Sequence, residues 1–92
     1  MNKLSLKDLE SIKLEFVFWS APHLREPDKF IKFFEKHRDV VLREFIANGR
    51  MIDTLKLFSI EEIQEGLERF ERQIPKRRRE LWEDFLDAYL NR

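Results

Sequence analysis

The stretch that decides the fold is SIEEIQEGLERFERQIPKRRRELWEDFLDAYL, residues 59–90, because its apolar residues keep a helical spacing on both sides of a proline. Ser59 is a favourable N-cap, and Glu62 three positions later completes a capping-box pattern. The apolar residues that follow are spaced by 3, 4, 3 and 4 positions: Ile60, Ile63, Leu67, Phe70 and Ile74. Gly66 lies just beside this stripe, where a small residue lets another helix approach closely. A helix is therefore predicted to begin at Ser59.

Pro75 lies in the middle of this stretch and has two interpretations. A proline removes a backbone hydrogen bond and disfavours helical angles at the preceding residue, which favours the start of a new helix. The N-cap of that helix would be Ile74, and isoleucine caps helices poorly. Carried through Pro75 unbroken, the stripe instead meets apolar residues on the same face or beside it: Leu81, Trp82, Phe85, Ala88 and Tyr89. We therefore predict one kinked helix over 59–91, with a pair of helices as the alternative.

The beginning of the chain is predicted to form a helix over 5–19. Ser5 opens it as the first residue of a capping-box pattern. Five apolar residues share one face of this helix: Leu6, Leu9, Ile12, Phe16 and Trp19. Leu14 and Phe18 fall outside that face, and the alternation over 14–18 would also suit a strand.

A second, central helix is predicted over 27–48. Pro27 suits its first position, and Gly49 is expected to close it in the left-handed conformation. Its apolar residues cover roughly 200° of its circumference, so it needs neighbours on two sides or a subunit interface. The pattern of the next segment, 50–58, fits either a short helical turn or a strand.

Together these elements predict an all-α fold, a small helical bundle of three to four helices in one domain over 1–92, with a long Pro-kinked C-terminal helix. The chain has two glycines and three prolines, which leaves little material for the turns that many short strands need. The alternative is an α+β fold with a small sheet from 13–19 and 51–58.

The composition excludes several classes of function. The formal net charge is zero, from 18 basic and 18 acidic residues, so no overall field attracts the chain to nucleic acid or to an anionic membrane. The absence of cysteine excludes disulfides, thiolate metal sites and thiol catalysis, and it fits a cytoplasmic location. The longest apolar run, 16–19, is far too short to cross a membrane.

The sequence carries no recognised pattern for catalysis. It lacks a glycine-rich phosphate loop, an HExxH motif and a nucleophile elbow. His37 is predicted to lie in the core on the central helix and His23 in a loop, and nothing in their spacing demands a metal. We predict no catalytic residues, no metal, no cofactor and no small-molecule substrate.

Between positions 69 and 79 the sequence has six cations and one acid. The cations are Arg69, Arg72, Lys76, Arg77, Arg78 and Arg79. Acidic segments flank them on both sides, which favours pairing within a fold or a dimer over a track for phosphates. Arg77 and Arg78 have no acidic residue at the four-residue helical spacing, so the sequence does not indicate which groups they face.

Nine phenylalanines and two tryptophans are more than so short a chain is expected to bury alone, and surplus apolar area indicates an interface. We predict a small helical protein–protein interaction module that acts as a homodimer or docks onto another protein. Its predicted interface is the apolar stripe Ile60, Ile63, Leu67, Phe70, Ile74, Leu81, Trp82, Phe85 and Tyr89. The alternative is a nucleic-acid-associated protein that contacts phosphates through the basic segment 69–79.

Overall fold

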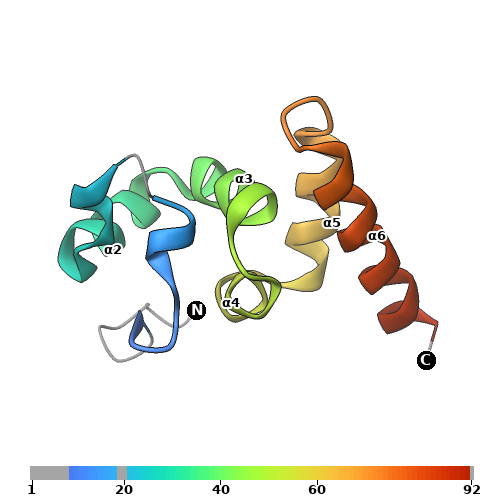
Figure 1. Ribbon diagram of the computed structural model, residues 1–92, viewed down its shortest axis with the longest axis horizontal. Helices are drawn as coiled ribbons and strands as arrows, with labels where there is room; N and C mark the ends of the chain where they lie inside the picture. The colour runs from blue at the N-terminus through green and yellow to red at the C-terminus, as the bar shows by residue number, and fades with distance from the viewer. Residues whose placement is uncertain (1–8, 19–20, 92) are drawn as a thin grey trace.

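The chain folds into α-helices and short 3-10 turns, in a computed structural model that describes residues 9–18 and 21–91 (Figure 1). In chain order the elements are η1 (Leu14–Phe16), η2 (Pro22–Arg25), α2 (Pro27–Lys36), α3 (Arg38–Asn48), α4 (Met51–Leu57), α5 (Ile60–Arg69) and α6 (Lys76–Leu90). The all-α prediction is confirmed. The α+β alternative is wrong, because the described residues hold no strand and 51–57 is helical.

The prediction of one helix over 5–19 is wrong where the structure describes it. Leu9 is helical, but the chain then turns and forms only the short η1. The N–H of Lys13 donates to the carboxylate of Asp53 at 3.0 Å instead of to a carbonyl one helical turn earlier. Leu9 and Ile12 of the predicted face are buried, but Phe16 is 51% exposed. Leu14 and Phe18, which the prediction placed outside that face, are buried. The predicted capping box at Ser5 and the residues Leu6 and Trp19 lie outside the described residues.

The predicted central helix over 27–48 is two helices. His37 separates α2 from α3 with the non-helical angles φ −130° and ψ 51°. A single straight helix with so wide an apolar arc would leave part of it in solvent, and the break allows both helices to turn buried residues, such as Phe30 and Phe45, into one core. His37 itself is exposed rather than in the core, and its ring packs on that of Phe33 at 4.8 Å.

Gly49 follows α3, but the prediction that it is left-handed is wrong. Its angles are φ −79° and ψ 165°, which is extended backbone that any residue adopts. The glycine is required for space instead, because a Cβ there would lie 2.7 Å from Cδ1 of Phe45 and 3.1 Å from Cγ2 of Val17.

The C-terminal stretch forms two helices, so the prediction of one kinked helix is wrong and the helix pair is correct. The capping box at the start of α5 is confirmed, with Ser59 and Glu62 exchanging hydrogen bonds of 3.1 Å. After α5 the N–H groups of Gln73 and Ile74 both donate to the carbonyl of Phe70, and the chain reverses direction (Figure 1). Pro75 itself is the N-cap of α6, with φ −54° and ψ 139°. A poor cap at Ile74 was therefore no obstacle to a new helix.

The core is centred on α3, which contacts α2, α4, α5 and α6 (Figure 1). Apolar side chains from four helices have no exposed area: Phe30, Val41, Phe45, Ile46, Ile63 and Trp82. Gly66 has the predicted role, because a Cβ there would lie 2.9 Å from Ile46 and 3.0 Å from Leu42 of α3. In the parts of the chain that are described, no helix is long and apolar enough to span a bilayer.

Candidate interaction surface

Arg78, one of the two cations without a predicted partner, points into the protein. Its guanidinium donates to the carbonyl of Ile46 at 3.0 Å, to that of Phe45 at 3.4 Å and also to that of Gly49. The buried indole N–H of Trp82, one turn further along α6, donates to Ile46 as well, at 3.1 Å. The last carbonyls of a helix need partners, and its C-terminal end favours a cation. Arg78 and Trp82 therefore attach α6 to the end of α3.

Burial has an electrostatic effect on this arginine. Desolvation lowers the pKa of the Arg78 guanidinium from its ordinary value, although it stays high enough for the group to remain charged. The three carbonyl oxygens are neutral acceptors, so the charge is stabilised by backbone dipoles at the C-terminal end of α3 rather than by an acid. The hydrogen-bonding groups of Arg78 therefore serve the packing of α6 on α3.

The other five cations of segment 69–79 are dispersed rather than gathered into one free patch. Three of them form ion pairs: Arg69 with Asp39 at 3.0 Å, Arg79 with Glu71 at 3.4 Å and Glu83 at 3.7 Å, and Lys76 with Glu80 at 3.9 Å. Arg72 and Arg77 are exposed, and no hydrogen bond or ion pair joins either to another described residue.

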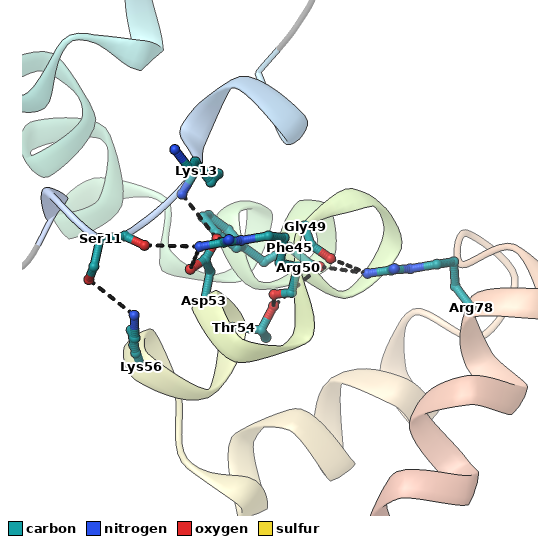
Figure 2. A network of polar contacts seen from close by, with 9 residues as sticks. All are labelled: Ser11, Lys13, Phe45, Gly49, Arg50, Asp53, Thr54, Lys56 and Arg78. Carbon is teal, nitrogen blue, oxygen red and sulfur yellow. Dashed lines mark hydrogen bonds and ion pairs between the residues drawn. The ribbon is translucent and has the colours of Figure 1, made fainter.

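A second polar cluster lies on the opposite side of the segment that joins α3 to α4. We call residues 45–54 the α3–α4 corner (Figure 2). Asp53 is fully buried there and accepts hydrogen bonds from the Lys13 N–H at 3.0 Å and from two guanidinium nitrogens of Arg50 at 2.8 and 2.9 Å. Arg50 also donates to the carbonyl of Ser11 at 3.0 Å. The N-terminal segment is thus held on one side of the corner and Arg78 of α6 on the other (Figure 2).

The pKa of Asp53 is the outcome of opposing effects. Burial raises it, but the hydrogen bonds from Arg50 and Lys13, together with the charges of Arg50 and Lys56, outweigh burial and hold the pKa below its ordinary value. The hydrogen bond to Asp53 in turn raises the pKa of Arg50. Sequence reasoning missed this cluster. The three-residue spacing of Arg50 and Asp53 indicates a pair, but nothing local points to a residue forty positions earlier.

A third contact that the sequence did not reveal joins the beginnings of α3 and α5. Arg38 donates to both carboxylate oxygens of Glu62, at 2.9 and 3.0 Å. These hydrogen bonds lower the pKa of Glu62 below its ordinary value, against the opposing effect of burial and with help from Ser59. The guanidinium also lies over the rings of Phe34 and Phe58, 4.9 and 5.0 Å from their centroids. Glu62 therefore serves both as a capping-box residue and as a tie between helices.

The predicted apolar stripe is divided by the fold. Four of its residues are buried in the chain's own core, namely Ile63, Leu67, Ile74 and Trp82. Three are half-buried against that core, namely Ile60, Phe70 and Phe85. Leu81 and Tyr89 remain 48% and 45% exposed, and Leu90, which the stripe did not include, is 55% exposed.

Leu81 belongs to a group of four exposed residues of α6 that we call the outer face: Arg77, Leu81, Asp84 and Ala88. At about 100° per residue they fall within about 60° of one another, well away from the inward side that carries Trp82. Phe85 lies between the two sides, with its ring at right angles to Trp82, centroids 5.9 Å apart, and stacked on Tyr89 at 6.1 Å. The helix lies at one end of the long axis of the molecule (Figure 1).

Comparison of the chain with protein-family models, curated proteins and solved structures found no match. Over residues 9–18 and 21–91, no group of three or more His, Asp and Glu side chains is placed to hold a metal ion.

Proposed function

We propose that this chain is a small helical protein–protein interaction module that self-associates through the outer face of α6. One observation carries the proposal: of the five large apolar side chains that are exposed among the described residues, three lie on α6, namely Leu81, Tyr89 and Leu90. Leu81 lies in the outer face, whereas Tyr89 and Leu90 lie about 80° and about 180° from it around the helix axis. Among the described residues α6 thus has more exposed large apolar side chains than any other element, which favours it as the interaction site.

A second copy of the chain is the partner that its charge favours. The formal net charge is zero, and acids and bases alternate in blocks along α5 and α6, so the surface is complementary to itself. Closed homodimers are the commonest assemblies of soluble proteins. We further propose a cytoplasmic location, which the absence of cysteine supports, and a binding role without catalysis.

The ion pairs of segment 69–79 support a protein partner over the nucleic-acid alternative. Arg78 is turned toward backbone carbonyls, and Arg69, Lys76 and Arg79 have carboxylates within 4.0 Å. A phosphate backbone that approached Arg77 would also meet Glu80 and Asp84 on the same helix, and these would repel it.

The proposal is tested by placing a charge on the apolar part of the outer face. Leu81→Asp is expected to leave the fold intact, because the side chain is 48% exposed, and to shift the chain to monomer at concentrations where the parent is dimeric. Sedimentation equilibrium measures the mass. Ile52→Asp is the matched control, since Ile52 is 57% exposed but lies on α4, and it should associate like the parent. Equal association of all three proteins would contradict the proposal.

The nucleic-acid alternative has its own measurement. Fluorescence anisotropy of a labelled single-stranded RNA and a labelled DNA duplex, at roughly 50 mM salt where phosphate contacts are strongest, is expected to show no binding. Salt-sensitive binding that Arg72→Glu weakens, without a change in dimer mass, would favour the alternative instead.

A further inference from the structure

We infer that the second copy docks with its α6 antiparallel to α6 of the first, so that Arg77 of each chain faces Asp84 of the other. This inference rests on the proposed self-association and specifies its geometry. It also answers what Arg77 faces, a question that the chain's own contacts leave open, since no ion pair joins Arg77 or Asp84 to another described residue.

The outer face has opposite charges on the two sides of an apolar centre. Arg77 precedes Leu81 by four positions and Asp84 follows it by three, which places them about 6 Å and about 4.5 Å away along the helix axis. All three side chains are exposed. With a two-fold axis near Leu81, the two leucines meet and each Arg77 lies opposite the partner's Asp84. A parallel arrangement would instead place like charges together.

The ends of α6 have the wrong charges for an isolated helix. Its first turn is Lys76-Arg77-Arg78-Arg79, and its acids, including Asp84 and Asp87, come later. Cations at a helix N-terminus oppose the positive end of the helix dipole. The other three cations have partners within the chain, and Arg77 is the one for which the described residues supply none. An antiparallel copy brings its acidic half alongside this basic turn and relieves the repulsion.

The size of the surface sets the expected strength. A helix of 15 residues is about 22 Å long, so contact along one such face falls at the small end of specific interfaces. Such interfaces belong to weak or transient complexes. We therefore expect a dimer that forms at high protein concentration and dissociates on dilution.

Charge exchange tests the geometry. Arg77→Glu makes both facing positions acidic and is expected to weaken the dimer about tenfold, since two favourable pairs become repulsive. Asp84→Arg makes both basic and should weaken it similarly. The double variant restores opposite charges across an antiparallel contact and should recover the parent's dissociation constant. In a parallel pair the single and double variants would behave alike, and this result would overturn the inference.

Crosslinking provides an independent readout, because the chain has no cysteine of its own. Leu81→Cys should form an intermolecular disulfide on mild oxidation, and a chain carrying both Arg77→Cys and Asp84→Cys should crosslink, whereas Arg77→Cys by itself should not. Rapid crosslinking of Arg77→Cys to itself contradicts the antiparallel geometry. If Leu81→Asp removes the dimer but the charge variants have no effect, the geometry is wrong and the proposed self-association stands. A parent chain that is monomeric at every concentration tested would contradict both the geometry and the proposed self-association.

Discussion

The α3–α4 corner and the outer face of α6 both contain charged residues, but among the described residues only those of the corner have ion-pair or hydrogen-bond partners. At the corner Asp53 is fully buried, and across the described residues no buried side-chain nitrogen or oxygen lacks a hydrogen-bond partner. On the outer face Arg77 and Asp84 are exposed and have no ion pair with any described residue. Neighbours in sequence can thus belong to different regions, since Arg78 ties α6 to the corner while Arg77 faces outward. A run of cations in a sequence does not define one site.

The strongest way to test this contrast is to remove a carboxylate from each region. Asp53→Ala leaves the Lys13 N–H and the Arg50 guanidinium without their acceptor and should lower the free energy of unfolding by about 2–4 kcal/mol. Urea unfolding followed by circular dichroism measures the loss. The work is done at about 2 µM protein, so that dimer formation does not add to stability.

Asp84→Ala is the matched control, because Asp84 is exposed and unpaired within the described chain. Its unfolding midpoint should equal the parent's within error. Equal destabilisation by the two substitutions would show that the corner and the outer face do not differ as described.

The adjacent residues Arg77 and Arg78 allow the same comparison of the two regions, with a smaller expected change in unfolding free energy. Arg78→Ala removes hydrogen bonds to three carbonyls at the end of α3 and should cost about 1–3 kcal/mol of unfolding free energy. Arg77→Ala should leave the monomer's stability unchanged and weaken only the dimer. A destabilised Arg77→Ala monomer, or an Arg78→Ala protein as stable as the parent, would be inconsistent with the assignment of the two side chains.

The smallest expected effect is a change in how the unfolding free energy depends on pH in acid, to which Asp53 of the corner contributes. The pKa of Asp53 is lower in the folded protein than its ordinary value, so its contribution is fully present above about pH 4 and is lost as the pH falls through the folded pKa. We expect the unfolding free energy of Asp53→Asn to fall less steeply than the parent's between about pH 5 and pH 2.

Glu62→Gln should flatten the same curve independently, because the pKa of Glu62 is also lowered in the fold. Unfolding in urea at a series of pH values records both slopes. An Asp53→Asn protein that is as acid-sensitive as the parent would mean that Asp53 is not held charged by the corner.

Features of the fold that depend on neighbouring residues were predictable from the sequence. The capping box of Ser59 and Glu62 needs only a three-residue spacing, and Gly66 stood out as a small residue beside an apolar stripe. Features decided by distant contacts were not. The end of the first helix depends on Asp53, forty residues beyond Lys13. The apolar residues before and after Pro75 keep the same helical spacing by coincidence, because the chain reverses direction there and the two parts are separate helices.

The candidate surface was predicted only in part for the same reason. Helical spacing identified Leu81 and Tyr89 as apolar residues of the C-terminal stretch, but periodicity does not separate residues that face the chain's own core from those that face outward. Ile63 and Trp82 share the stripe and are fully buried. The roles of Arg77 and Arg78 required the position of α3, since the carbonyls that bind Arg78 lie about thirty residues earlier.

Mass in solution tests the central claim, self-association through α6, most directly. Sedimentation equilibrium of the parent chain from about 5 to about 300 µM, a range chosen for a small interface, should show an average mass that rises from the monomer's 11.4 kDa toward twice that value. Leu81→Asp should stay near 11.4 kDa over the same range. A parent that remains at the monomer mass at the highest concentration, or a dimer that Leu81→Asp leaves intact, would contradict the account.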